Sequence, residues 1–110
     1  MRQWRTLGHA HPIFTKEVRR LLGEDEYRAL QLALILRPEQ GPVIRGSRGL
    51  RKIRWGGGGK GKRRGLRVIY YWDPREEVFY MLFAYGKTEQ EDLTPSQLRV
   101  LSRLVREEFK

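Results

Sequence analysis

The sequence predicts a single α+β domain in which two helices precede a small, mainly antiparallel sheet and one helix follows it. Apolar residues recur at helical spacing before Pro38, three apolar segments between residues 50 and 85 are typical of strands, and helical spacing returns after residue 94. Because short connections join the strands, we expect antiparallel neighbours with the helices on one face of the sheet. The 110 residues suit one domain of common size, of which residues 1–12 are only weakly patterned.

Two helices are predicted in the N-terminal part of the chain, after a candidate edge strand at residues 3–7. The first helix begins at Thr15, a favourable N-cap, and ends at Gly23. The second begins at Asp25, which can cap it, and carries a stripe of apolar residues. It ends at Pro38, because the residue before a proline is disfavoured in the α region.

Three strands are predicted after Pro38. Residues 50–55 alternate between apolar and basic side chains, and residues 66–72 are rich in β-branched and aromatic types. Residues 78–85 are apolar at every position, which is typical of a central strand covered on both faces. A glycine-rich, cationic connection over residues 56–65 joins the first two strands.

The last helix has a start signal in Thr94, Pro95 and Gln97. Threonine and glutamine three positions apart form a capping box, and proline is favoured at the first helical position. Apolar residues then recur at helical spacing, so this helix packs an apolar stripe. Three carboxylates precede it, and we interpret their charge as favourable near the helix N-terminus: Glu89, Glu91 and Asp92.

The positive charge of the chain is concentrated in one segment. Between Gln40 and Trp72 there is no acidic residue, and the whole formal net charge of +10 arises there. The basic residues of this segment are Arg45, Arg48, Arg51, Lys52, Arg54, Lys60, Lys62, Arg63, Arg64 and Arg67. A field of one sign attracts a polyanion, so nucleic acid is the first partner that the sequence indicates.

Several other classes of protein are disfavoured. The chain has no cysteine, and its two histidines, His9 and His11, have no acidic partner near them in sequence, so we expect neither a metal site nor a cofactor. Gly56, Gly58 and Gly61 match a dinucleotide-binding pattern, but a strand follows them where that pattern needs a helix. No apolar run is long enough for a membrane span, and a cytoplasmic location is expected.

The predicted sheet provides a candidate phosphate-contacting face. Lys52 and Arg54 share one face of the first long strand, and Arg67 lies on the next strand. Tyr85 and Lys87 share a face at the end of the last strand, provided that this strand continues so far. Each of these residues alone fits an ordinary solvated or core position. As a cluster inside an acid-free segment, they favour a surface that contacts phosphate.

Four sequence blocks resemble the RelE/HigB branch of the toxins of bacterial type II toxin–antitoxin systems, within the wider RelE/ParE superfamily. The blocks are GLRKIRW at residues 49–55, GKRRGLRVIYY at 61–71, LFAYGK at 82–87 and EDLT at 91–94. The resemblance extends from about Phe14 to the C-terminus. It departs at Thr88, where better-known members often place a further arginine after the basic residue.

The resemblance implies an α+β toxin that enters the ribosomal A site and cleaves mRNA without a metal, by attack of a ribose 2′-hydroxyl on the adjacent phosphate. It also implies a cognate antitoxin, often of the helix-turn-helix type. The matching positions imply Lys52, Arg54, Arg67 and Lys87 as catalytic residues. The late tyrosine or histidine of better-known members is missing, and Tyr85 is our candidate for a phenol from a different place. Because crowded cations lower the pKa of a lysine, Lys52 or Lys87 is the candidate base. The candidate contacts to RNA and the ribosome are Arg48, Arg51, Lys60, Lys62, Arg63 and Arg64.

Two alternative functions remain open at this stage. A non-enzymatic poison of DNA gyrase, as in the ParE branch, would depend on helical surfaces and would tolerate loss of Lys52 or Arg67. A plain nucleic-acid-binding module would use the basic loop only to neutralise phosphates, so each lost cation would weaken binding modestly without any turnover.

Overall fold

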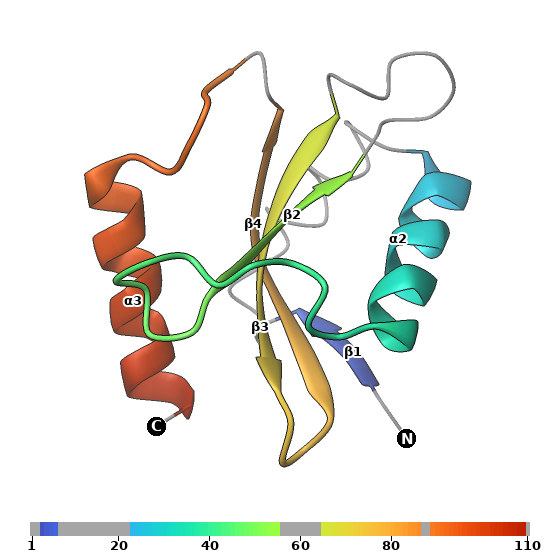
Figure 1. The fold of residues 1–110 in the computed structure, drawn as a ribbon, viewed down its shortest axis with the longest axis horizontal. Helices are drawn as coiled ribbons and strands as arrows, with labels where there is room; N and C mark the ends of the chain where they lie inside the picture. Colours follow the sequence, from blue (N-terminus) through green and yellow to red (C-terminus); the bar gives the residue numbers. More distant parts are fainter. Residues whose placement is uncertain (1–2, 7–22, 56–64, 87–88, 110) are drawn as a thin grey trace.

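The computed structural model describes residues 3–6, 23–55, 65–86 and 89–109 of the chain (Figure 1). Its elements are β1 (Gln3–Thr6), α2 (Glu24–Leu36), β2 (Arg51–Trp55), β3 (Leu66–Asp73), β4 (Val78–Gly86) and α3 (Pro95–Phe109). The α+β class is therefore confirmed. One described helix precedes the long strands, and the first predicted helix, from Thr15, lies outside the described residues.

The sheet has four strands in the order β1-β4-β3-β2. The strands β2, β3 and β4 are antiparallel to their neighbours, whereas β1 pairs in parallel with β4, with Gln3 opposite Val78. The expected short strand near the N-terminus is thus present at the edge of the sheet. β4 lies between β1 and β3, which confirms its predicted central position.

The two described helices lie on opposite faces of the sheet (Figure 1), so the prediction that helices cover one face is wrong. On one side, α2 packs in a buried cluster of Leu30, Leu34, Ile53, Leu66, Val68, Tyr70, Phe79, Met81 and Ala84. On the other side, α3 packs in a cluster of Leu50, Ile69, Leu82, Tyr85, Leu101 and Val105. The cause lies in β3, where every residue from Leu66 to Tyr70 is buried, so that both faces require a cover.

The start of α2 differs from its prediction by two residues. Gly23 is the N-cap, with an extended backbone and no side-chain hydrogen bond to the helix, so the assignment of Asp25 as the cap is wrong. Asp25 instead lies in the first turn with Glu24 and Glu26, where three negative charges stabilise the positive end of the helix dipole. The helix ends at Leu36, just before Pro38, as predicted.

The predicted capping box starts α3. The hydroxyl oxygen of Thr94 accepts a hydrogen bond from the backbone N–H of Gln97 at 3.1 Å. The side-chain oxygen of Gln97 accepts one from the N–H of Thr94 at 2.9 Å. These reciprocal bonds satisfy two backbone donors at the start of α3.

The chain between α2 and β2 is held against the sheet by Tyr70. Its buried hydroxyl donates a hydrogen bond to the carbonyl of Pro38 at 2.8 Å and accepts one from the N–H of Gly41 at 3.1 Å. Gly41 fits closely there, because a Cβ atom at this position would lie 2.9 Å from the carbonyl oxygen of Lys52. This connection then continues as the 44–50 loop, which crosses in front of α3 (Figure 1).

Within the described part of the chain, no helix combines the length and the apolar composition that crossing a membrane would require.

Candidate functional site

The register of the sheet brings four of the predicted site residues together. Arg54 of β2 lies opposite Arg67 of β3, which in turn lies opposite Tyr85 of β4. Directly opposite residues point to the same face, with their Cβ atoms about 5 Å apart. Lys52 is two residues from Arg54 along β2 and therefore shares that face. We call Lys52, Arg54, Arg67 and Tyr85 the cationic face; it lies on the same side of the sheet as α3.

The four residues differ in exposure. Arg54 is exposed, and the Lys52 side chain is 22% exposed, whereas Arg67 is only 7% exposed in the middle of the sheet. The ion pairs found between described residues do not include Arg67. A guanidinium group that is buried without a carboxylate partner is unusual, because burial of an uncompensated charge is costly. The position of Arg67 thus provides a positive field that solvent screens only in part.

Asp92, from the segment that precedes α3, reaches the cationic face. Its carboxylate lies 2.8 Å from the ammonium nitrogen of Lys52. The hydrogen bond from Lys52, and then its charge, lower the pKa of Asp92 below its ordinary value, and the charges of Arg54 and Arg67 act in the same direction. The interpretation of Asp92 as only a favourable charge for the helix is therefore incomplete, since it also pairs with a predicted site residue.

Tyr85 places a phenol beside Arg67. The residue is 2% exposed, and its hydroxyl has no hydrogen-bond partner among the described residues. Burial raises the pKa of this phenol, and the negative charge of Asp92 raises it further, while Arg67 acts in the opposite direction. The phenol therefore keeps its proton at neutral pH and can donate it to a ligand oxygen.

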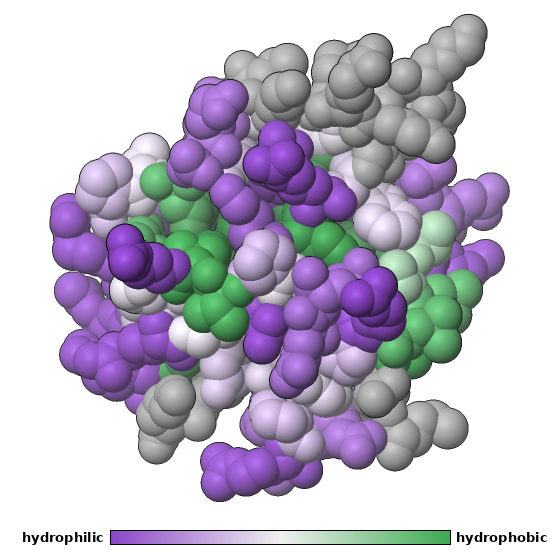
Figure 2. All heavy atoms as spheres, in the orientation of Figure 1, coloured by the Kyte–Doolittle hydropathy of each residue, from purple (hydrophilic) through white to green (hydrophobic). Residues whose placement is uncertain are grey.

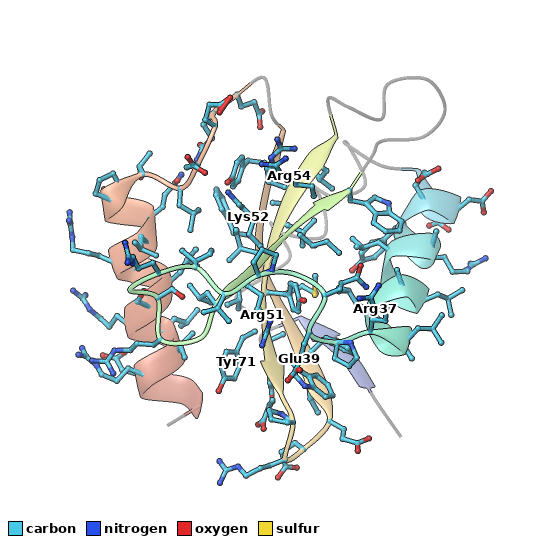
Figure 3. The ribbon with its side chains drawn as sticks, viewed as in Figure 1. Arg37, Glu39, Arg51, Lys52, Arg54 and Tyr71 are labelled. Atoms are coloured by element: carbon cyan, nitrogen blue, oxygen red, sulfur yellow. The ribbon has the colours of Figure 1, made fainter. Side chains whose placement is uncertain are left out.

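Arg51 and Arg48, two of the predicted RNA contacts, lie away from the cationic face. Arg51 donates hydrogen bonds to the carbonyls of Gly41 at 2.8 Å and Glu39 at 3.1 Å, and so ties β2 to the connection after α2 (Figure 3). Arg48 lies in the 44–50 loop, beside α3. The other predicted cations lie outside the described residues: Lys60, Lys62, Arg63, Arg64 and Lys87.

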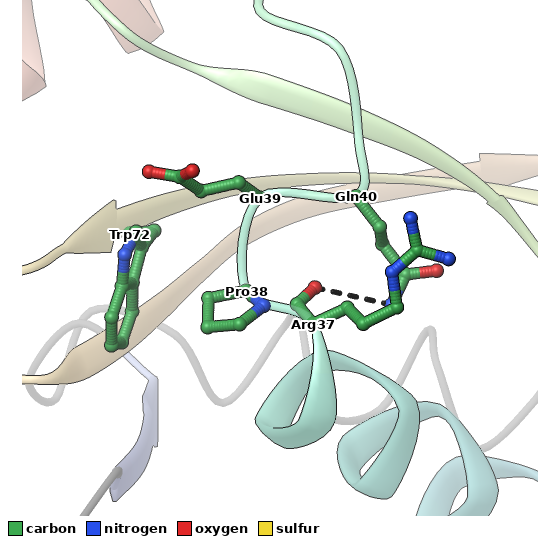
Figure 4. Close-up of a pocket in the computed structure, with 5 residues that line it drawn as sticks. All are labelled: Arg37, Pro38, Glu39, Gln40 and Trp72. Atoms are coloured by element: carbon green, nitrogen blue, oxygen red, sulfur yellow. Dashed lines mark hydrogen bonds between the residues drawn. The ribbon is translucent and has the colours of Figure 1, made fainter.

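A hollow of about 510 Å³ lies at the end of α2, lined by Arg37, Pro38, Glu39, Gln40 and Trp72 (Figure 4). Trp72 packs on Phe79 of the α2-side cluster, so this hollow is on the opposite side of the sheet from the cationic face. Its lining holds one carboxylate and one guanidinium group, and it has no concentration of either charge. Among the described residues, no group of three or more histidines and carboxylates could hold a metal ion.

The cationic face can therefore bind a phosphate group with three positive side chains and one phenol. Hydrophilic side chains extend over the upper end of β2 and over α3, at the left of the view in Figure 2. Such a face suits any ligand that gathers negative charge on phosphate oxygens. A comparison of the sequence with models of known protein families finds no match.

Proposed function

We propose that this chain is the toxin of a type II toxin–antitoxin pair and that it cleaves mRNA on the ribosome with the cationic face. One observation carries the proposal: Arg54, Arg67 and Lys52 share one face with the buried, unpartnered hydroxyl of Tyr85. The sequence blocks that resemble the RelE/HigB toxins contain these same residues. The partner molecules are then mRNA in the ribosomal A site and a cognate antitoxin in the cytoplasm.

In the proposed reaction, the ribose 2′-oxygen attacks the adjacent phosphorus atom. A bond from phosphorus to the 2′-oxygen forms, the bond to the 5′-oxygen of the next nucleotide breaks, and the 2′-hydroxyl proton leaves to a base while the 5′-oxygen gains one. The transition state gathers negative charge on the phosphate oxygens. Preorganised positive groups stabilise such charge more than the charge of the ground state, which lowers the barrier.

The residues of the cationic face fit different parts of this reaction. Arg67, which is buried, supports the charge on the phosphate oxygens, and Arg54 binds from the exposed side. Tyr85 retains its proton because its pKa is raised, so it acts as a hydrogen-bond donor and as the candidate acid. Lys52 exchanges Asp92 for the phosphate, and this exchange is easy because the Asp92 side chain is 74% exposed.

The test is a primer-extension assay on a defined mRNA, with the purified protein and with or without translating ribosomes. We expect cuts only with ribosomes, in register with codons, and no cuts with the variant Arg67→Ala. Arg75→Ala, an exposed arginine in the turn between β3 and β4, is the matched control and should cut like the wild type. Thermal unfolding of both variants checks that they are folded.

An intact message with the wild-type protein would overturn the proposal. Full cutting by a folded Arg67→Ala variant would show that cleavage does not depend on the cationic face. A gyrase poison predicts growth inhibition that survives the loss of Lys52 or Arg67, and a plain binding module predicts RNA binding without any cuts.

A further inference from the structure

We propose that an arginine-lined hollow between α3 and the 44–50 loop is a second binding site, which holds backbone phosphates of RNA. We call it the arginine hollow; its lining includes Gly46, Arg48, Arg99, Ser102, Arg103 and Arg106. Its volume is about 270 Å³, several times the roughly 30 Å³ that a water molecule occupies in the liquid, which leaves room for a phosphate group.

The charge of the arginine hollow is of one sign. Four guanidinium groups line it, and no described carboxylate does. Arg99, Arg103 and Arg106 are four and three positions apart along α3, so they form one stripe on the helix. The ion pairs between described residues involve Arg51 and Lys52 and none of these arginines. Like charges at this spacing oppose one another on a helix, and a bound anion relieves that opposition.

Ser102 adds an unused hydrogen-bond donor to the lining. Its hydroxyl oxygen is buried, and no atom in the described part of the chain forms a hydrogen bond with it. A serine in the middle of a helix ordinarily bonds to the carbonyl four residues earlier or points to solvent, and Ser102 does neither. Buried polar groups in folded proteins almost always have a partner, so an unpaired hydroxyl within a positive hollow points to an anionic ligand.

The 44–50 loop holds Arg48 in a fixed position beside α3. Arg48 has a backbone φ of 63°, a left-handed conformation that residues other than glycine rarely adopt. The buried hydroxyl of Ser47 accepts a hydrogen bond from the N–H of Leu50 at 3.0 Å, and the N–H of Ile44 donates to the carbonyl of Leu50 at 2.8 Å. A loop held in this way presents its guanidinium group without a large ordering cost on binding.

The identification of the ligand as RNA rests on the proposed function. The arginine hollow and the cationic face lie on the same side of the sheet, since α3 packs with Leu50, Ile69 and Tyr85 in one cluster. A single RNA strand has a phosphate at every nucleotide, so a strand bound at the cationic face can place further phosphates against α3. Guanidinium groups bind phosphate oxygens in a bidentate manner, which suits arginine better than lysine for this role.

The experiment compares two variants that lose the same amount of charge. Arg99→Gln/Arg103→Gln removes two arginines of the hollow, and Arg28→Gln/Arg75→Gln removes two exposed arginines elsewhere. Binding of a labelled 20-nucleotide single-stranded RNA is measured by fluorescence anisotropy over a series of KCl concentrations. The slope of log K against log[KCl] is negative, and we expect it to become less steep by about 1.4 for the hollow variant, at about 0.7 per phosphate contact, and to stay unchanged for the control.

Equal slopes for the two variants would overturn the inference, because only net charge would then matter. Equal RNA slopes together with a selective loss of binding to an acidic peptide would also overturn it, in favour of a protein ligand. The same samples are tested in the ribosomal cleavage assay. If the wild-type protein cuts mRNA but the two variants have equal salt slopes, only the inference about the arginine hollow is refuted. If the slopes differ but the wild-type protein does not cut mRNA, only the catalytic proposal is refuted.

Discussion

Two buried tyrosines show how the same side chain serves different ends in this chain. The hydroxyl of Tyr70 has two backbone partners, the carbonyl of Pro38 and the N–H of Gly41. The hydroxyl of Tyr85 has no partner within the described ranges, although it is buried beside Arg67. A satisfied hydroxyl stabilises the fold, and an unsatisfied one costs free energy unless a ligand pairs with it.

The two tyrosines therefore predict opposite outcomes for the same substitution. Tyr70→Phe leaves the Pro38 carbonyl and the Gly41 N–H unpaired, so we expect it to lower the free energy of unfolding by about 1–3 kcal/mol. Tyr85→Phe removes an unpaired hydroxyl, so we expect it to leave stability unchanged or to raise it slightly, and the proposed function predicts slower mRNA cleavage. Urea denaturation and primer extension on both variants measure the two effects. A strongly destabilised Tyr85→Phe variant would contradict this assignment.

The pair of Lys52 with Asp92 predicts a dependence of stability on pH. The folded-state pKa of Asp92 lies below its ordinary value of 3.8, so the unfolded chain binds this proton more readily than the folded one. The stabilisation is present above the unfolded pKa and is lost as the pH falls through the folded one. Thermal unfolding between pH 2.5 and 7 should show this loss in the wild type, and Asp92→Asn should show a smaller one. Parallel stability curves for the wild type and Asp92→Asn would refute this prediction.

The sequence indicates all four residues of the cationic face but not Asp92, the partner of Lys52. Alternation along β2 and β3 predicts that Lys52 and Arg54 share a face and that Arg67 lies on the adjacent strand. Asp92 could not be predicted as the partner of Lys52, because forty positions separate them and only the path of the chain into α3 brings them together. Arg51 looks like its neighbours in sequence, but alternation turns it to the α2 side.

At the scale of elements, local sequence signals predict where helices and strands begin and end more accurately than they predict how these elements pack together. The predicted strands and the start of α3 agree with the structure to within about one residue. Short connections alone do not determine the side of the sheet on which each helix packs. Both faces of β3 are buried, but Arg67 and the tyrosines of this strand are residue types that are often exposed, so the sequence does not indicate this burial. The start of α2 at Gly23 has no side-chain signal at all.

The capping box of α3 predicts a measurable contribution to stability. Thr94→Ala removes the hydroxyl that accepts the Gln97 N–H, so we expect a loss of about 1 kcal/mol in the free energy of unfolding. Ser96→Ala, an exposed change in the same helical turn, is the control and should have little effect. Chemical denaturation compares the two. Equal losses would show that the hydrogen bonds of the box do not stabilise the helix start.

At the scale of the whole molecule, charge is distributed unevenly around a neutral core. The cationic face and the arginine hollow lie on the α3 side of the sheet, whereas the acidic first turn of α2 lies on the other. Such separation orients the molecule as it approaches a polyanion and raises the rate of encounter.

This distribution predicts that RNA stabilises the folded chain in a salt-dependent way. A ligand that binds only the folded state raises the unfolding temperature, and its effect grows with concentration. We expect a 20-nucleotide RNA to raise the melting temperature at low salt and to lose this effect near 1 M KCl, where the screening length falls to about 3 Å. Differential scanning fluorimetry measures the shift, with an uncharged polymer as the control. A shift that persists at high salt would contradict an electrostatic origin.

The parallel pairing of β1 with β4 also constrains the order in which the chain folds. β1 pairs with a strand that lies 75 positions further along the chain, as Gln3 and Val78 show. Contacts between such distant positions form slowly, because a long loop must close before they are gained. Until then, the outer edge of β4 exposes unpaired backbone groups to other chains. The chain is thus most vulnerable to aggregation while β1 has not yet paired with the edge of β4.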